Sequence, residues 1–577
     1  MFLSLSDLPT EILLIILNQL PTSTLFNVGV LCSRLNFLAM PLYLERMGIP
    51  KPSELCLIKS RHNRHKNQLS GLILNFGLAH IDRLVCNVDN KHDQDLFVDI
   101  RYLMQDIQRI HQFVSRLSSV GSACIISHYL GEKWSLRSEV VRDFIATFLG
   151  LLETLIQKSC KSLQVIHSHP IAIETGYSFQ LVDDAPVVRT PFVESIKQHV
   201  SSLRHRHRLS TDRVEDPELH GDGWRYRQAI VHEPIFPLSS GNTHQSILTN
   251  FDIASDLLLL PPFSTWTFST LRNSPITSLT LSLPRQVTKE EFHHYIFPKI
   301  AHAVPNLEEI KLAFCRDEFM RTVVENLSLL PTLRKVTFGL TVIGLLPEIN
   351  HELNHELEIT LPHLLSFTGS PAQAAYFFGH NIHCPNFRTI NIVADGYFLT
   401  RHEESGTFVG NDLTKLATRL SERNISPRVS LCLYNDGGLP TPRTEHTLSS
   451  DIPDWTYGFD RIACLTLETP PSFPYWQTSS MQAAYALAWL DIFRGIDSLT
   501  FTIRRQTLST TAQAEQEAEL RTIITEKHPN IVKFNLANLR DETHYHWSNA
   551  RDDLERGTQG IPLLRTKSAA PCVCSDF

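Results

Sequence analysis

The sequence contains no apolar run that approaches the ~20 residues a helix needs to cross a bilayer. Six apolar residues follow one another from Ile12 to Leu17, close to the start of a chain of 577 residues. A secretory signal has a basic start and a clean apolar centre. Here the first basic residue is Arg34, and Asp7, Pro9 and Glu11 interrupt the approach to the run. We therefore expect neither a membrane span nor an export signal.

The cysteines show no pairing pattern. There are eleven, an odd number, and no two stand at the CxxC spacing of a zinc ribbon. This distribution is typical of reduced, mostly buried thiols. Cys574 occupies the position of a prenylation signal, but Ser575 and Asp576 stand where that signal has aliphatic residues. We expect an intracellular protein of the cytoplasm or the nucleus, without a lipid anchor.

Excess charge of either sign is small. The net charge of -7 gives no global reason to expect binding to nucleic acid or to a membrane surface. Residues 203–209 read LRHRHRL, a short basic cluster. Asp212, Glu215 and Asp216 follow closely and no aromatic residue interleaves, so a solvated loop is the favoured interpretation.

Motifs for catalysis and metal binding are also scarce. The sequence has no glycine-rich phosphate loop, HExxH, GxSxG or kinase-type set. The pair His293–His294, the pair His544 and His546, and Cys572-x-Cys574 lack a second pair at a structural-zinc spacing. Carboxylates are plentiful but unpatterned, so none is nominated as a general acid or base. We predict no cofactor, no metal and no enzymatic activity.

The first 48 residues carry the most specific pattern. Pro9 suits the first turn of a helix, and Ile12, Ile15 and Ile16 follow helical spacing before Pro21 ends that helix. A second helix with Leu25, Val28 and Leu31 follows, and a third begins near Ser33 and ends before Gly48. Three short helices in ~40 residues cannot enclose so many apolar side chains. The surplus predicts a surface that another part of the chain, or another protein, covers.

These residues resemble the F-box motif. The match reads Leu8-Pro9-x-Glu11-Ile12-Leu13, Ile16-Leu17-x-x-Leu20-Pro21 and Leu25-x-x-Val28-x-x-Leu31-Cys32-x-Arg34. The resemblance implies docking to a Skp-type adaptor, which joins F-box proteins to cullin and RING subunits of a ubiquitin ligase. By motif position it assigns adaptor contact to Leu8, Pro9, Ile12, Ile16, Leu17, Leu20, Leu25, Val28 and Leu31. Some of these must instead pack the helices together, and the motif does not separate the two groups.

A second pattern recurs through the later part of the chain: a proline, an apolar anchor two residues later, and apolar positions three and five beyond the anchor. It occurs at Pro305–Leu312, Pro331–Phe338, Pro385–Ile392 and Pro529–Leu536, with a weaker copy at Pro362–Phe367. Copies without the proline are Ile276–Leu281, Ile462–Leu467 and Ile496–Phe501. The number of proline-led matches, four complete and one weaker, indicates a repeat.

Predicted helices precede these copies. They span residues 290–303, 320–330, 481–493 and 512–527, and residues 138–158 lead into Leu163–Ile166 in the same way. A helix followed by a short strand every ~23–35 residues is the arrangement of a leucine-rich-repeat solenoid. The pattern resembles degenerate leucine-rich repeats, because the Asn or Cys that normally follows is mostly missing. An irregular α/β domain with short strands is the alternative.

The predicted organisation has four parts. Residues 1–48 form the three-helix F-box, and residues 49–260 form a helix-rich region, either early irregular repeats or a separate domain, with an exposed loop at 201–223. Residues 261–540 form the degenerate leucine-rich-repeat part, and 541–577 a polar, partly disordered tail. The predicted fold class is α/β: an F-box followed by an irregular horseshoe.

The predicted function is substrate recognition in a Skp–cullin–F-box ubiquitin ligase. The F-box would dock the Skp-type adaptor, and the repeats would hold an unidentified target protein. One alternative is an interaction scaffold that binds the adaptor without delivering a target. Another is an enzyme with an unrecognised site in residues 50–260.

Overall fold

The computed structural model describes residues 8–59, 68–88, 100–127, 134–135, 139–167, 173–174, 177–181, 224–228, 246–282, 287–313, 317–339, 358–395, 406–423, 427–434, 462–468, 479–492, 495–504 and 510–539. The chain divides into two compact units, Met1–Leu307 and Glu308–Phe577. The loop predicted at 201–223 and the tail predicted at 541–577 lie outside the described residues.

The first unit begins with helices α1 (Thr10–Gln19), α2 (Thr22–Gly29) and α3 (Ser33–Arg46). Pro9 and Pro21 stand immediately before α1 and α2, where their missing N–H groups leave no hydrogen bond unmade. Gly48 follows α3 with a φ of 85°, a conformation that glycine adopts without steric cost. The three predicted helices are thus present, with the predicted breaks between them.

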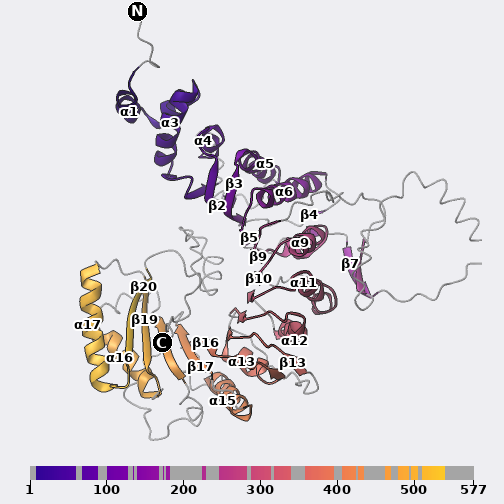
Figure 1. The fold of residues 1–577 in the computed structure, drawn as a ribbon, viewed down its shortest axis with the longest axis vertical. Helices are drawn as coiled ribbons and strands as arrows, with labels where there is room; N and C mark the ends of the chain where they lie inside the picture. The colour runs from indigo at the N-terminus through magenta and orange to yellow at the C-terminus, as the bar shows by residue number, and fades with distance from the viewer. Residues whose placement is uncertain are drawn as a thin grey trace, which may run out of the picture. The chain divides into compact units, whose positions relative to one another are not determined.

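A parallel sheet follows in the same unit. Its strands are β1 (Leu55–Lys59), β2 (His80–Val88), β3 (Ser119–Ser127), β5 (Ser162–His167), β9 (Asn250–Ala254) and β10 (Ser278–Ser282), and they neighbour one another in that order. The helices are α4 (Gln68–Leu74), α5 (Ile100–Arg116), α6 (Glu139–Gln157), α8 (Asp256–Leu259) and α9 (Phe263–Arg272). A last helical stretch joins α10 (Lys289–Glu291), the π-helical η2 (Phe292–Ile296) and α11 (Phe297–Ala303). Figure 1 shows α5, α6, α9 and α11 succeeding one another along one side of these strands.

The second unit repeats the arrangement. Its parallel strands run in the order β11 (Glu309–Ala313), β12 (Lys335–Phe338), β14 (Ser366–Gly369), β16 (Thr389–Asp395), β17 (Arg428–Tyr434), β18 (Ile462–Glu468), β19 (Ser498–Arg504) and β20 (Lys533–Leu539). The helical segments are α12 (Asp317–Asn326), the 3-10 turn η3 (Leu327–Leu329), α13 (Pro371–Phe377), α15 (Gly406–Glu422), α16 (Ser479–Ile492) and α17 (Thr510–Lys527).

Short accessory pairs lie outside these sheets. In the first unit β4 (Trp134–Ser135) pairs with β6 (Ile173–Glu174), and β7 (Tyr177–Leu181) pairs with β8 (Trp224–Gln228) in antiparallel fashion. In the second unit β13 (Glu358–Thr360) pairs with β15 (Asn381–His383).

Burial alternates along many strands of both sheets, but the last five residues of β2 and of β3 are all buried. In β10, β12 and β14 every second residue is buried and the residues between are half-exposed. Parallel sheets covered on both faces show near-continuous burial. In the second unit one face of the sheet therefore packs against the core, and the other face presents residues such as Thr337, Thr368 and Asn391, which lie in register on neighbouring strands.

The predicted repeat copies all fall on strands. Of their anchors, Leu307, Leu333, Leu364 and Ile531 are buried just before β11, β12, β14 and β20, whereas Phe387 is half-buried just before β16. Helix α5 is amphipathic, with Leu103, Ile107, Ile110 and Phe113 buried along one side. The boundary predicted at residue 260 lies inside a sheet that continues from β9 to β10. Within the described residues, no helix combines the length and apolar character that a bilayer span requires.

Candidate functional site

Exposed apolar side chains are concentrated in the first three helices. Of ten large hydrophobic residues that are exposed in the described part of the chain, six lie between residues 12 and 37. They are Ile12, Ile15, Ile16, Val30, Leu31 and Phe37. We call Ile12, Ile15, Ile16, Val30 and Leu31 the N-terminal apolar face. A clustering of this kind marks an interaction site, whereas single exposed hydrophobics are ordinary.

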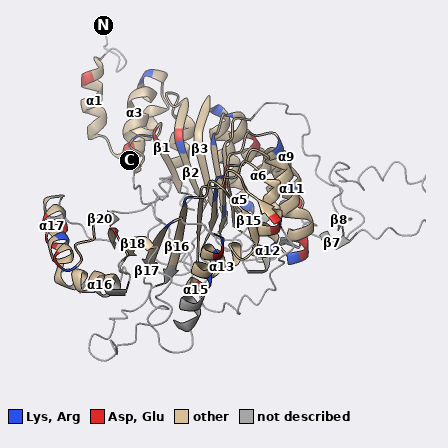
Figure 2. Cartoon of the chain, turned by 60° about the horizontal axis from the view of Figure 1, so that its bottom comes forward, with Lys and Arg blue, Asp and Glu red and all other residues tan. Residues whose placement is uncertain are grey.

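Helical periodicity places part of this face on α1. Ile12, Ile15 and Ile16 are 44%, 61% and 38% exposed, and their i, i+3, i+4 spacing puts them on one side of the helix. The opposite side of α1 buries Leu13 and Leu17. Figure 2 shows α1 without basic residues and with one acidic residue, Glu11 in its first turn. The exposed side of α1 is therefore hydrophobic and nearly uncharged.

Two of the leucines assigned by motif position, Leu17 and Leu25, lie in the interior of the three helices. Leu17 is 2% exposed and Leu25 is fully buried, beside the buried Leu35 and Met40 of α3. Gly29 permits this packing, because a Cβ added there would stand 2.6 Å from Cε of Met40. Leu17 and Leu25 thus hold the helices together and leave no side-chain surface for a partner.

The other motif positions lie nearer the surface. Pro9, Ile12, Ile16 and Leu31 are exposed, and Leu31 is the most exposed of the face at 69%. Leu8, Leu20 and Val28 are half-buried. Two exposed residues, Ile15 and Val30, were not among the residues assigned by motif position. Helical spacing alone indicated Ile15, whereas nothing in the motif indicated Val30.

Two arginines of α3 fix the ends of α1. Arg34 donates hydrogen bonds to the carbonyl oxygen of Leu8 at 2.7 Å and to Oγ1 of Thr10 at 3.4 Å. Arg46 donates to the carbonyl oxygen of Asn18 at 2.6 Å and also to that of Leu20. The last carbonyls of a helix lack intrahelical donors, so a guanidinium there is well placed. These bonds orient the apolar face of α1 relative to α3.

A buried amide joins the helices to the segment that follows. Nδ2 of Asn36, which is 1% exposed, donates to the carbonyl oxygens of Gly29 at 2.9 Å and Leu74 at 2.8 Å. Its Oδ1 accepts from the backbone N–H of Phe76 at 3.0 Å. Gly71 of α4 also lies against α3, because a Cβ there would stand 2.5 Å from Cε1 of Tyr43. The three helices and α4 therefore pack as one body.

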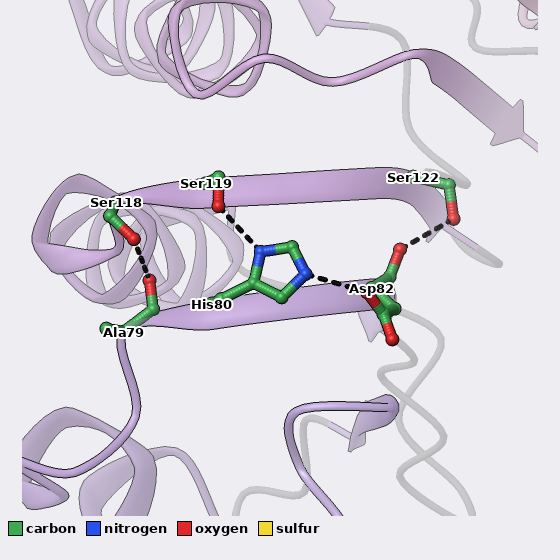
Figure 3. Close-up of polar contacts among 6 residues, drawn as sticks. All are labelled: Ala79, His80, Asp82, Ser118, Ser119 and Ser122. Carbon is green, nitrogen blue, oxygen red and sulfur yellow. Dashed lines mark hydrogen bonds and ion pairs between the residues drawn. The ribbon is translucent and has the colours of Figure 1, made fainter.

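A second cluster with potential chemistry lies at the amino ends of β2 and β3 (Figure 3). Nδ1 of His80 is 2.6 Å from Oγ of Ser119, and Nε2 of His80 is 2.7 Å from Oδ1 of Asp82. Serine, histidine and aspartate in this order form the nucleophilic triad of many hydrolases. In such triads the aspartate is buried. Here the side chains of His80 and Asp82 are 48% and 66% exposed.

Water can compete for both hydrogen bonds of such an open imidazole. The neighbouring bonds of this cluster, from Oγ of Ser118 to the carbonyl oxygen of Ala79 at 2.7 Å and from Oγ of Ser122 to that of Asp82 at 3.2 Å, also join the two strands. We therefore assign the cluster to aligning β2 with β3. Among the described residues, no group of three or more His, Cys, Asp or Glu is placed to hold a metal ion.

A comparison with known families bears on the first three helices. The family model of the F-box domain matches residues 5–45, which contain α1, α2 and nearly all of α3. No curated protein matches the chain. The match supports an F-box protein, although it covers only this short part of the sequence and does not extend to the predicted leucine-rich repeats. F-box domains bind Skp-type adaptors, and a cullin associates through the adaptor in ubiquitin ligases of this type.

Proposed function

We propose that this protein is a substrate-recognition subunit of a Skp–cullin–F-box ubiquitin ligase. One observation carries the proposal: the residues that match the F-box hold an apolar face that their own core leaves exposed. Such ligases act in the cytoplasm and the nucleus, where we expect this protein.

The energetics of the face support docking. Complete burial of an isoleucine or leucine side chain contributes about 1.5–3 kcal/mol. Ile12, Ile15 and Leu31 are each at least 44% exposed, so a partner that covered them would remove a large apolar area from water. The arginine contacts to both ends of α1 support a preorganised face, which lowers the entropic cost of binding.

We propose further that the two sheets are degenerate leucine-rich repeats. In each unit the strands of the sheet neighbour one another in the order of the chain, and a helix lies between most successive strands, as α5 does between β2 and β3. Doubly wound sheets reverse their strand order and carry helices on both faces. Sequential strand order, with alternating burial along the strands of the second unit, instead favours a solenoid, in which each repeat contacts only its neighbours.

The open strand faces are the surface we propose for the target protein. In the second unit Asn391 donates from Nδ2 to Oγ1 of Thr368 at 3.3 Å, along a row of neutral polar residues. Glu309, on the first strand of that unit, pairs with Lys335 at 3.0 Å and with Lys311 at 3.4 Å. Burial acts to raise the pKa of Glu309, but the two lysines hold it below its ordinary value. Rows of outward side chains of this kind can recognise a protein segment.

In this proposal the protein does no chemistry itself. It holds the target near a ubiquitin-loaded enzyme and so raises the effective concentration of the target lysine. Packed helices and sheets suit that task, because within each unit they hold the binding side chains in defined positions.

The test is co-purification with a Skp-type adaptor. We expect the wild-type protein to bind, and the variant Ile12→Asp/Ile16→Asp to lose binding, because two carboxylates would be buried against apolar side chains. Val532→Asp is the matched control, because Val532 is an exposed aliphatic residue in the other unit. Absence of adaptor with the wild-type protein would overturn the proposal. Adaptor without cullin would favour an interaction scaffold.

A further inference from the structure

Two exposed phenylalanines lie beside the F-box helices. Phe37 of α3 is 55% exposed, and Phe76, in the turn between α4 and β2, is 57% exposed. Phe76 lies well beyond residue 45, where the F-box match ends. Large aromatic residues are enriched among the side chains that dominate binding energy at interfaces.

The structure brings Phe37 and the turn that carries Phe76 together. The ring of Phe37 lies against Gly77, where an added Cβ would stand 3.1 Å from Cδ1 of Phe37. The backbone N–H of Phe76, the preceding residue, donates to Oδ1 of Asn36, the preceding residue on α3. Consecutive residues of α3 thus contact consecutive residues of the turn.

The position of Phe76 is fixed from both sides. Asn36 holds its backbone, and the guanidinium carbon of Arg116, the last residue of α5, stands 5.6 Å from the centre of its ring. Gly77 is held as well, because its N–H donates to Oδ1 of Asn75 at 3.1 Å. A ring that is exposed but already ordered loses little entropy on binding. The exposed Arg116, which lies over this ring, favours an acidic group on a partner that covers Phe76.

We propose that Phe37 and Phe76 extend the adaptor-docking surface beyond the F-box, and that the same Skp-type adaptor covers them with an apolar segment that places a carboxylate near Arg116. We choose the adaptor as the partner because these residues adjoin the F-box. Phe37 lies within the matched residues, and Phe76 is hydrogen-bonded to Asn36, the residue before Phe37. The proposal rests on the proposed function, because it assumes that the F-box binds this adaptor.

The experiment measures the Kd of purified adaptor for the full-length chain. We expect Phe37→Ser/Phe76→Ser to weaken binding by about tenfold or more, as for side chains that dominate an interface. Arg116→Glu is expected to weaken binding about threefold or more through charge reversal. Val532→Ser, at an 81% exposed position in the other unit, is the control for loss of an exposed apolar side chain and should bind as the wild type does.

A second measurement does not depend on how the double variant folds. In the variant Phe76→Cys, we expect the adaptor to slow maleimide labelling of the new thiol at least about tenfold, while Val532→Cys labels equally with and without adaptor. If the wild type binds, Ile12→Asp/Ile16→Asp does not, and both Phe76 measurements are unchanged, the extension is overturned and F-box docking stands. If the wild type does not bind, both proposals fail.

Discussion

The backbone N–H of Phe76 donates a hydrogen bond to Oδ1 of Asn36 at 3.0 Å, across 40 residues of sequence. The side-chain amide of Asn36 in turn donates from Nδ2 to the carbonyl oxygens of Gly29 in α2 and Leu74 in α4. A single buried side chain therefore joins the three F-box helices to the first sheet, which begins just after them. This relationship leads to the first of four predictions.

Asn36→Ala should destabilise this junction. The substitution leaves the carbonyls of Gly29 and Leu74 and the N–H of Phe76 without their partner, and each unmade buried hydrogen bond costs about 1–3 kcal/mol. Hydrogen exchange measures the effect, as faster exchange at the Phe76 amide and in α4. Asn27→Ala, at an exposed asparagine of α2, is the control. Unchanged exchange at Phe76 in the Asn36 variant would contradict the assigned role.

Gly29→Ala should loosen the packing of α2 on α3. The new Cβ would stand 2.6 Å from Cε of Met40, so the methionine must move, and overpacking of this kind costs about 1–3 kcal/mol. Met40→Leu removes Cε, and we expect the double variant to regain part of the loss. Thermal unfolding of the two single variants and the double variant gives the coupling free energy between the two substitutions. Strict additivity of the two effects would show that the close contact does not limit the packing.

The buried and exposed cysteines should differ in their rates of alkylation. Burial raises the pKa of Cys56 and of Cys160 to about 12, and also raises that of Cys86. These thiols should resist alkylation at pH 8, because the thiolate is the nucleophile. Cys32, which is exposed beside Leu31, should react first among the described cysteines.

Bound adaptor should slow alkylation at Cys32 if the N-terminal apolar face is the docking surface. Mass spectrometry of alkylated peptides, with and without adaptor, measures this protection. The exposed position of Cys32 makes the comparison independent of any substitution. Equal rates with a saturating adaptor would place the interface elsewhere.

His167 should make stability depend on acid pH. Burial lowers its pKa to about 3, against about 6.5 in an unfolded chain, and its ring packs 6.1 Å from that of Phe148. The folded state favours the neutral imidazole, so its contribution is complete above about pH 6.5 and declines as the pH falls towards 3.

The comparison of His167→Gln with the wild type at pH 7 and pH 5 tests this. We expect acidification from pH 7 to pH 5 to lower the unfolding temperature of the wild type more than that of the variant. The control is His363→Gln, at an exposed histidine that precedes β14, and it should leave the wild-type difference unchanged. An identical acid response of His167→Gln and the wild type would show that His167 does not control it.

Much of the local structure could be predicted because it depends on neighbours in sequence. Pro9, Pro21 and Gly48 marked the ends of the helices, since proline lacks an N–H and glycine tolerates a positive φ. The apolar spacing of the repeat copies predicted the strands that contain Val336 and Phe367 for the same reason: side chains alternate along a strand.

Which residues of the three F-box helices are buried and which are exposed could not be predicted in this way. Leu17 and Ile16 are adjacent and similar in chemistry, yet Leu17 is 2% exposed and Ile16 is 38% exposed. The difference arises because α3 covers one side of α1 and leaves the other side open. Contacts between distant segments also placed Phe76 beside Phe37, which no sequence pattern indicated.

The sequence by itself determined the three N-terminal helices, the strands of the repeat copies and the segment that resembles an F-box, because periodicity and chain breaks act over a few residues. The tertiary structure decided which apolar side chains reach the surface and which polar groups join the helices to the sheet. Burial depends on what packs against each residue, and contacts such as those of Arg34 with Leu8 and of Asn36 with Phe76 join positions 26 and 40 residues apart.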